Sequence, residues 1–412
     1  MSSRNIRKTK NQTPMITDIL KSAYHPSEVL AMVRIKFGNI SLSDNKEPLE
    51  NIACHTSDRD FCYASLNKVS RSFAIVIQQL PEELKDPVCV FYLVLRGLDS
   101  VEDDMDYPAG LRLPLLRSFH EKLFDKDWRI ENVGDSHDYR VLLANFDKVI
   151  RAYQALDEDY RLVIADICQK MGNGMADYAE RKVVTLHDYN DYCYYVAGLV
   201  GIGLSSLFSA SGLESARLKD EAELANSMGL LLQKTNISRD YYEDLNLGRT
   251  FWPKQIWGKY TDRLDELQKN PSSPESLACI NELVTDALTH VGNCILYLNM
   301  IRDKQVFKFC AIPQVMAMAT LAKIYNNPDV FTEVVKIRKG IAAKLMLKTN
   351  DMDSVRKSME KFVAEIRKKL NTEDPNYTQT KKRLNRIIEA LDDVKYNPNI
   401  LLEGTIEQTV LF

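Results

Sequence analysis

The acidic pattern D-x-x-E-D occurs twice in this chain, and it limits the possible folds more than any other feature of the sequence. The first copy occupies residues 99–103 and the second residues 240–244. The first follows residues 88–95, a run that is apolar on every side and is therefore typical of a helix buried in a core. The fold must therefore place carboxylates at the end of a buried helix. This excludes a reading in which the acids lie on a solvated surface helix.

At helical spacing each acidic copy belongs to a longer polar stripe. Residues three and four apart lie on the same side of a helix. One such stripe consists of Tyr92, Arg96, Asp99 and Asp103, and a second consists of Gln233, Asn236, Asp240 and Asp244. We expect both stripes to face a common cavity.

These acids need a positive partner, because carboxylates four residues apart on a helix repel each other. Mg²⁺ prefers hard oxygen ligands and commonly binds one or two carboxylates together with water and substrate phosphates. That preference fits two open acidic patches better than the closed oxygen cage of Ca²⁺; the alternative is that the acids are solvated helix ends. The predicted ligands of Mg²⁺, or of Mn²⁺ in its place, are Asp99, Glu102, Asp103, Asp240, Glu243 and Asp244.

Arginines accompany both acidic patches. They are Arg71, Arg96, Arg239 and Arg249. A guanidinium binds a phosphate oxygen pair in bidentate geometry, so arginines beside a metal-binding patch favour a diphosphate site. An isolated arginine would more often be a surface or ion-pairing residue.

The fold class follows from the scarcity of turn-forming residues, with 16 Gly and 14 Pro in 412 residues. From Asp18 the pattern is helical, and neither a period-two strand nor an interdomain linker interrupts it. The expected breaks are at Pro26, Pro48, Pro81, 107–110, 132–138 and 270–274. We expect an all-α fold: one helical domain over 18–395, closed by helices at about 353–370 and 378–394, with a basic flexible tail at 1–17 and an extension at 396–412.

Charge and cysteine usage exclude several classes of protein. Lys and Arg number 54 against 57 Asp and Glu, a net charge of −3, which argues against nucleic acid as a partner. The eight cysteines form no C-x-x-C pair, so we expect reduced core thiols rather than disulfides or a zinc site. We find neither a secretory signal nor an uninterrupted apolar window of ~18 residues, so the chain as given is expected to be soluble.

Seven stretches resemble the squalene synthase family, within the wider group of head-to-head prenyl synthases, and together they span about residues 20–395. They are 70–74 (S-R-S-F-A), 91–105, 192–201, 233–244, 248–253 (G-R-T-F-W-P), 309–317 and 335–340. The chain departs from the family at Ser238, where Ile is usual, and lacks the usual hydrophobic C-terminal anchor. We expect little effect from Ser238, which should lie off the acidic stripe.

The resemblance implies an isoprenoid synthase bundle with a central cavity. It also implies condensation of two farnesyl diphosphates to presqualene diphosphate, then NADPH-dependent rearrangement to squalene, a sterol precursor. A phytoene- or dehydrosqualene-type synthase shares the acidic motifs but needs no reductant; residues 309–314 and 336–340 favour the reductive enzyme. An inactive helical scaffold that binds partners through its closing helices is disfavoured by the intact motifs.

The resemblance also assigns roles to residues. Tyr192 would assist the first half-reaction by removing a proton or stabilising a cation, with Tyr92 and Phe309 as further catalytic aromatic residues. Diphosphate or the phosphates of NADPH would contact Arg71, Arg96, Arg239, Lys336 and Arg338. Further substrate contacts would come from Phe73, Val200, Leu204, Gln233, Asn236, Arg249, Tyr297, Cys310, Pro313 and Gln314.

Two parts of this assignment have no support from sequence pattern alone. No G-x-G-x-x-G follows a strand, so the NADPH site is not visible as a dinucleotide fingerprint. The glycines Gly198, Gly201 and Gly203 would let a prenyl chain lie close to a helix backbone; the alternative is tight helix packing. By resemblance we expect a monomer at the cytosolic face of the endoplasmic reticulum, either with its anchor removed or attached to the membrane by other means.

Overall fold

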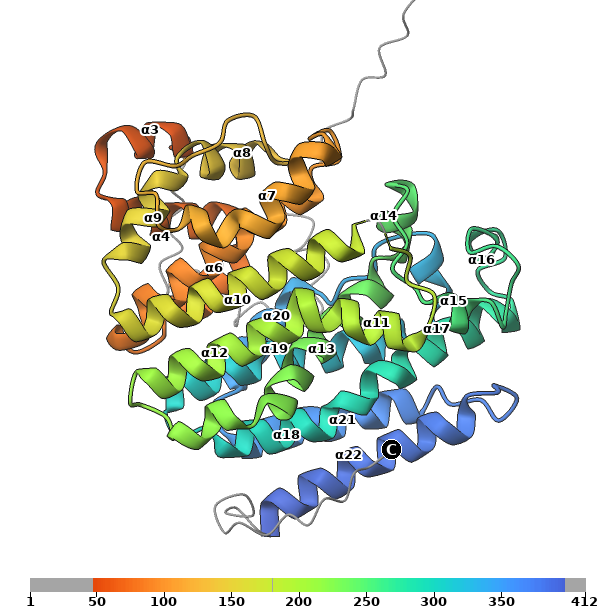
Figure 1. The fold of residues 1–412 in the computed structure, drawn as a ribbon. Coiled ribbons are helices and arrows are strands. Elements are labelled where there is room, and N and C mark those ends of the chain that lie inside the picture. The colour runs from red at the N-terminus through yellow and green to blue at the C-terminus, as the bar shows by residue number, and fades with distance from the viewer. Residues whose placement is uncertain (1–46, 180, 397–412) are drawn as a thin grey trace, which may run out of the picture.

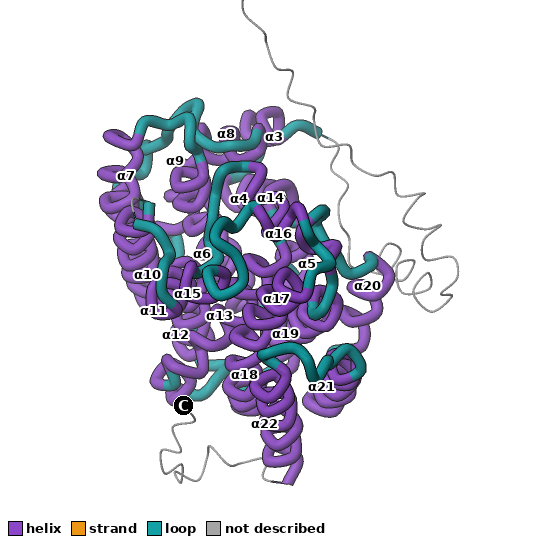
Figure 2. Tube along the Cα trace, turned by 90° about the vertical axis from the view of Figure 1, so that its right-hand side faces the viewer, coloured by secondary structure: helices purple, strands orange, loops and turns teal. Residues whose placement is uncertain are grey.

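The computed structural model describes residues 47–179 and 181–396, and within them the chain is helical and contains no strand (Figures 1 and 2). The expected tail at 1–17, the break at Pro26 and nearly all of the extension at 396–412 lie outside these residues. The N-terminal half contains α3 (Leu49–His55), α4 (Asp58–Val69), α5 (Arg71–Ile77), α6 (Glu82–Asp103), α7 (Ala109–Lys122), α8 (His137–Ala144), α9 (Phe146–Gln154), α10 (Glu158–Tyr178), α11 (Leu186–Cys193), the π-helix η1 (Tyr194–Gly198) and α12 (Leu199–Ala210). The C-terminal half contains η2 (Ala216–Asp220), α13 (Ala222–Arg239), α14 (Tyr241–Asn246), α15 (Lys254–Trp257), α16 (Glu266–Lys269), α17 (Pro274–Ala287), η3 (Leu288–His290), α18 (Val291–Met300), α19 (Lys304–Ile324), η4 (Pro328–Phe331), α20 (Lys339–Lys348), α21 (Met352–Arg367) and α22 (Tyr377–Tyr396).

Prolines mark where several of these helices begin, as the sequence predicts. Helix α3 starts after Pro48, α6 after Pro81 and α7 after Pro108. Proline is tolerated at a helix start, where its missing N–H would have no intrahelical partner. Helix α17 begins at Pro274, and Ser273 caps it by accepting a hydrogen bond from the backbone N–H of Ser276 at 3.1 Å.

Helix α13 lies in the middle of the bundle, where it packs against α12, α17, α18, α19 and η1. Helix α10 packs against α6, α7 and α12. Figure 1 shows α10 and α12 side by side, with their axes in similar directions. The run 88–95 of α6 is buried except for Tyr92, which is partly buried, as expected for a core helix. The helices that carry the two acidic motifs therefore belong to the inside of the bundle.

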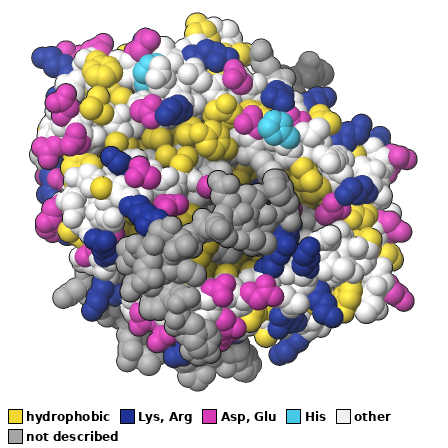
Figure 3. Space-filling view, turned by 60° about the horizontal axis from the view of Figure 1, so that its bottom comes forward, with side chains coloured by type: hydrophobic (Ala, Val, Ile, Leu, Met, Phe, Trp, Pro, Cys, Tyr) yellow, Lys and Arg dark blue, Asp and Glu magenta, His cyan; other side chains and the backbone are white. Residues whose placement is uncertain are grey.

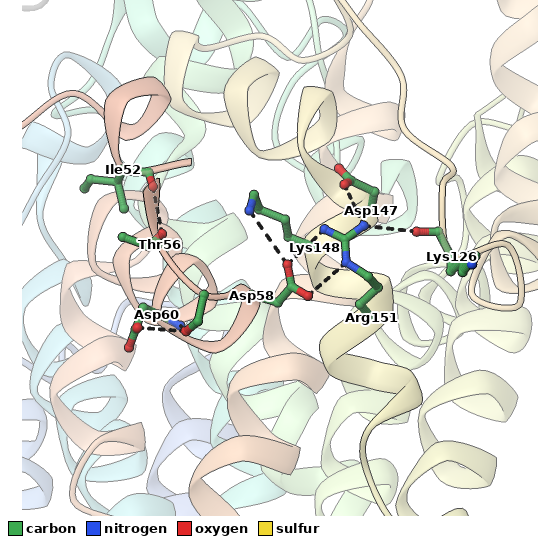
Figure 4. A network of polar contacts seen from close by, with 9 residues as sticks. Ile52, Thr56, Asp58, Asp60, Lys126, Asp147, Lys148 and Arg151 are labelled. Atoms are coloured by element: carbon green, nitrogen blue, oxygen red, sulfur yellow. Dashed lines mark hydrogen bonds and ion pairs between the residues drawn. The ribbon is translucent and has the colours of Figure 1, made fainter. Parts of the chain in front are cut away.

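Ion pairs fasten the N-terminal helices to one another. Arg151 of α9 donates two hydrogen bonds of 2.9 Å to the carboxylate of Asp58, in the first turn of α4, and one of 2.8 Å to Asp147 (Figure 4). Lys148 lies 3.7 Å from Asp58 on the other side. Because Asp58 also precedes the free N–H groups of its own helix, this carboxylate is stabilised from three directions.

The closing helices agree with the prediction to within a few residues. Helix α21 packs against α19, and α22 packs against α17 and α18. A buried hydrogen bond of 2.6 Å joins the hydroxyl of Thr285 in α17 to that of Thr380 in α22. On the face shown in Figure 3, acidic and basic side chains are interspersed, in line with the near-balanced net charge.

All eight cysteines are free, as predicted, and seven are buried, whereas Cys54 is exposed. Two stretches are long and apolar enough to cross a membrane by length and composition, Leu186–Ala210 and Lys304–Ile324. The second is mostly buried inside the bundle, which is typical of the core helix of a globular protein.

Candidate active site

The first acidic motif occupies the last turn and a half of α6. Asp99 remains 28% exposed, and its carboxylate lies 3.5 Å from Nη1 of Arg96. The next acid along the chain, Asp104, is buried and accepts hydrogen bonds from three backbone N–H groups, the shortest from Gly134 at 2.7 Å. Asp104 therefore shapes the loop after α6, while the acids of the motif are left for other partners.

The second acidic motif does not lie on one continuous helix, so this part of the prediction was wrong. Helix α13 ends at Arg239 and α14 begins at Tyr241, with Asp240 between them at φ −93° and ψ 13°. Asp240 accepts two hydrogen bonds from the guanidinium of Arg239, at 2.8 and 2.6 Å. Gln233 is partly buried and Asn236 is exposed. The spacing of the stripe is nearly kept, because the backbone N–H of Asp240 still donates to Asn236.

Arg249 joins the two motifs. Its Nη1 donates to Asp103 at 2.8 Å, and its Nη2 lies 3.7 Å from Asp244. Gly248, with φ at +73°, makes the turn that brings Arg249 back over α14, a conformation that disfavours a side chain. Arg249 thus brings together two acidic motifs that start 141 residues apart in the chain, at Asp99 and Asp240, while the common cavity expected between them stays a prediction.

Burial and crowding make these carboxylates hard to ionise. Burial is the main cause that raises the pKa of Asp99 to about 6, and neighbouring Asp103 adds to it while Arg96 opposes it. Burial likewise raises the pKa of Asp244 to about 6, against the opposing charge of Arg249. The pKa of Glu102 is raised well above its usual value by burial and by the two other acids of its motif. The site therefore contains more carboxylates than its arginines can neutralise.

The donor set fits Mg²⁺. All six predicted ligands carry carboxylate oxygens, which this ion prefers. The raised pKa values of Asp99, Glu102, Asp103 and Asp244 indicate that a cation would relieve the site. Among the described residues no three His, Cys, Asp or Glu side chains are grouped closely enough to form a complete metal cage. Mg²⁺ does not need one, because it usually keeps several waters and takes substrate phosphates as ligands.

The guanidiniums offer donors for an anion. Arg96 lies over the rings of Tyr92 and Tyr139, at 5.7 and 5.4 Å. The buried Nε groups of Arg96 and Arg249 have no hydrogen-bond partner among the described residues. These two donors beside one acidic cluster are therefore available to the acceptors of a ligand. Arg71 begins α5, but its side chain lies outside what the structure describes.

Aromatic rings surround Tyr192 on α11. Its ring stacks on Phe251 with centroids 5.2 Å apart, and Tyr178 lies 5.6 Å away. Burial raises the pKa of Tyr192 well above its usual value, and the charges of Glu102, Asp103 and Asp99 raise it further. Tyr192 thus lies within the electrostatic influence of the first acidic motif, while its predicted role in the first half-reaction stays a prediction. Sequence reasoning missed the roles of Tyr178 and Tyr139, whose only signal was their residue type.

The predicted apolar contacts lie partly in the core of the bundle. Tyr297 exchanges a hydrogen bond of 2.7 Å with Ser205, and Gln314 donates to the backbone carbonyl of Met228 at 3.1 Å. Phe309 packs edge-on against Phe208, with centroids 6.0 Å apart. The ring of Phe73 lies 5.9 Å from that of Tyr92, and Val200, Leu204 and Pro313 are partly buried while Cys310 is buried. Their contact with a substrate stays a prediction.

A pocket of about 140 Å³ lies beside Phe309. Val76 of α5 and Gln79, just after that helix, form one side, and residues of α19, including Lys308 and Ile312, form the other. It places open space next to the predicted apolar lining.

Two of the predicted NADPH contacts are solvent-accessible. Lys336 and Arg338 are exposed in the segment between η4 and α20. This segment follows η4, whose Phe331 packs against Tyr241 of α14 with centroids 5.2 Å apart. It therefore starts beside the helix that carries the second acidic motif.

The glycines of α12 and its neighbours serve helix packing, which was the alternative to the predicted passage for a prenyl chain. A Cβ atom on Gly201 would lie 2.2 Å from the carbonyl oxygen of Ala225, and one on Gly198 would lie 2.0 Å from Oδ1 of Asn226. Gly203 abuts Phe91 in the same way, at 2.7 Å. These glycines let α12 approach α13 and α6 closely. Ser238, in turn, is buried and donates to the carbonyl of Lys234, off the acidic stripe as expected.

This chain is similar in sequence and in fold to proteins that are already known. The model of the squalene/phytoene synthase family matches residues 66–340. The squalene synthase BSS of Botryococcus braunii is 47% identical over 385 residues, which cover 90% of this chain and 81% of that protein. The squalene synthase of Rattus norvegicus is 44% identical over 370 residues, covering 90% and 88%.

A solved structure, the complex of TcSQS with the ligand BPH1237, superimposes with a TM-score of 0.80 at 46% identity and covers 82% of this chain and 99% of that one. Identity at this level over most of both chains shows common descent as well as a common helical fold of the isoprenoid synthase type. The chain therefore belongs to the squalene synthases, within the squalene/phytoene synthase family.

Proposed function

We propose that this protein is a squalene synthase that joins two farnesyl diphosphates head to head into presqualene diphosphate and then converts this intermediate to squalene with NADPH. The observation that carries the proposal is the contact of Arg249 with Asp103 at 2.8 Å and with Asp244 at 3.7 Å. It supports a single site in which one guanidinium lies between an acid of each motif. Two such motifs suit a reaction with two diphosphates.

We assign Asp99, Glu102 and Asp103 to one diphosphate and Asp240, Glu243 and Asp244 to the other, each through Mg²⁺. Bound Mg²⁺ would stabilise the negative charge of the departing diphosphate. The guanidiniums of Arg96, Arg239 and Arg249 would hold diphosphate oxygens, with Nε of Arg96 and Nε of Arg249 as donors that the protein leaves unpaired. Arg249 would exchange its carboxylate partners for the substrate on binding.

Departure of diphosphate leaves an allylic cation, which water would quench. The aromatic group of Tyr192, Phe251 and Tyr178 supplies a dry lining with ring faces that attract positive charge. Because burial raises the pKa of Tyr192, its phenol keeps its proton at neutral pH. This supports stabilisation of the cation by the neutral phenol of Tyr192, through its hydroxyl oxygen as well as its ring.

The reductive step would use Lys336 and Arg338 to bind the phosphates of NADPH. Both are exposed, and their segment follows η4, which packs on α14. We further propose that the protein acts at a membrane, since a C30 hydrocarbon product is insoluble in water. By the resemblance, this would be the cytosolic face of the endoplasmic reticulum, with the protein as a monomer.

The test is incubation of the purified protein with farnesyl diphosphate and Mg²⁺, with and without NADPH, and analysis of the products by gas chromatography. We expect squalene with NADPH and presqualene diphosphate without it. The same hydrocarbon in both incubations would refute the reductive reaction and favour a synthase of the dehydrosqualene type. No consumption of farnesyl diphosphate in either would refute the proposed function.

A further inference from the structure

Helix α13, which leads into the second acidic motif, carries a buried lysine. Lys234 is 1% exposed, although an ammonium group is among the costliest groups to remove from water. Its Nζ forms an ion pair with Oδ2 of Asp286 at 2.6 Å and lies over the ring of Tyr189, 5.2 Å from the centroid. The charge is therefore held by one carboxylate and one aromatic face.

These two partners come from helices with different functions. Tyr189 lies on α11, three residues before Tyr192, so both rings project from the same side of that helix. Asp286 lies on α17, which packs against α13 and carries none of the predicted site residues. Lys234 thus links the helix of the buried tyrosine, the helix of the second acidic motif and a third helix outside the site.

Lys234 cannot act on a substrate directly. Positions 234 and 236 differ by two residues, or about 200° around a helix, and Asn236 is exposed while Lys234 is buried. On the far side of α13, Lys234 instead adjoins His290, whose pKa is lowered by burial and by the charge of Lys234. A neutral imidazole there leaves Asp286 as the charge partner of Lys234.

A buried ion pair is weak evidence for stability, because apolar residues of similar volume often replace such a pair without loss. In some proteins such a pair instead specifies a unique geometry. Here the geometry is the placement of α11 on α13. From these contacts we infer that Lys234 is a positioning residue that holds α11, and with it Tyr192, in place against α13 through the ring of Tyr189.

This inference rests on the proposed function, because it needs Tyr192 to act in the first half-reaction. The experiment compares Lys234→Met, which keeps the stem and removes the charge, with Lys234→Arg and with Tyr189→Leu, which removes the ring but leaves the ion pair. The matched control is Thr285→Val, at the neighbouring position of α17, which loses a buried 2.6 Å hydrogen bond to Thr380. Each variant is measured for kcat and KM with farnesyl diphosphate and for its thermal unfolding midpoint.

We expect kcat to fall about 10- to 100-fold in Lys234→Met and in Tyr189→Leu, since small misplacements of reacting groups cost rates of this order. KM should change less than about twofold, because the acidic motifs stay intact. Lys234→Arg should recover most of kcat, and Thr285→Val should keep kcat at a similar loss of stability.

Several results would overturn the inference. One is a kcat in Lys234→Met no lower than in Thr285→Val, and another is an unchanged kcat in Tyr189→Leu, which keeps its fold through the remaining pair. A raised KM with unchanged kcat would assign Lys234 to substrate binding instead. If Lys234→Met does not fold, the double variant Lys234→Met/Asp286→Leu removes both charges, and wild-type kcat in it refutes positioning. Absence of turnover in the wild-type protein would instead refute the proposed function.

Discussion

Asp244 is ionised at a cost to the fold, and its replacement by Asn should stabilise the metal-free protein while it abolishes turnover. Burial raises the pKa of this carboxyl from 3.8 to about 6, although Arg249 opposes the shift. Two pH units correspond to about 3 kcal/mol of free energy of unfolding at neutral pH. Because the side chain is 17% exposed, solvent screens part of this, and we expect a gain of ~2 kcal/mol for Asp244→Asn. Arg249 would keep its 2.8 Å hydrogen bond to Asp103, so no unpaired cation is created.

The sign of the pH dependence follows from proton linkage. Between pH 3.8 and about 6 the folded protein holds a proton on Asp244 that the unfolded chain has released, so the free energy of unfolding falls as pH rises through this range. The advantage of Asp244→Asn should therefore be full above pH 6 and shrink as the pH falls toward 4. Millimolar Mg²⁺ should raise the unfolding midpoint of the wild-type protein and have less effect on the variant.

The assay is urea unfolding followed by circular dichroism, at several pH values and with a chelator present. The matched control is Asp58→Asn, because the ion pair with Arg151 lowers the pKa of Asp58, and the same substitution should there reduce stability at neutral pH. A stability of Asp244→Asn equal to or below that of the wild-type protein at pH 7.5 without metal would refute the reasoning.

Three further predictions concern single side chains. Tyr192→Phe should stop formation of presqualene diphosphate while leaving Mg²⁺-dependent binding of a non-reactive farnesyl diphosphate analogue intact; single-turnover product analysis checks this, and normal turnover would contradict it. Lys336→Ala should weaken NADPH use and let presqualene diphosphate accumulate, which a titration with NADPH measures; an unchanged NADPH dependence would remove the cofactor assignment. Gly201→Ala should lower the free energy of unfolding by about 1–3 kcal/mol, since its Cβ would lie 2.2 Å from the carbonyl oxygen of Ala225; urea unfolding decides, and unchanged stability would show that α12 can shift freely.

The sequence predicted those parts of the structure that depend on local patterns. Prolines and helical spacing located several helix starts, and the apolar run 88–95 identified a core helix that ends in acids. The two acidic patterns were expected to meet because a pair of acidic stripes on apolar helices needs a shared cavity. The contacts of Arg249 with Asp103 and Asp244 bring the two motifs together, and the shared cavity stays a prediction.

Features that depend on which helices are neighbours could not be predicted. Helical spacing identifies a face but not the helix that covers it, so the burial of Lys234 and its pairing with Asp286, 52 residues away, left no sequence signal. For the same reason the glycines of α12 were assigned to substrate passage, although Gly201 is needed for contact with Ala225. The break between α13 and α14 at Asp240 was not predicted, because the helical spacing of the acidic stripe continues through it.

Arg249 acts as a built-in counterion for the carboxylates of the two acidic motifs, and a metal ion could replace it. The guanidinium holds oxygens of Asp103 and Asp244 that the metal would also require, so the arginine and the metal compete for the same acceptors. Loading of the site is then an exchange of one cation for another, and the freed guanidinium becomes available to the incoming anion. Metal and diphosphate should consequently bind with positive cooperativity, each lowering the free-energy cost of admitting the other.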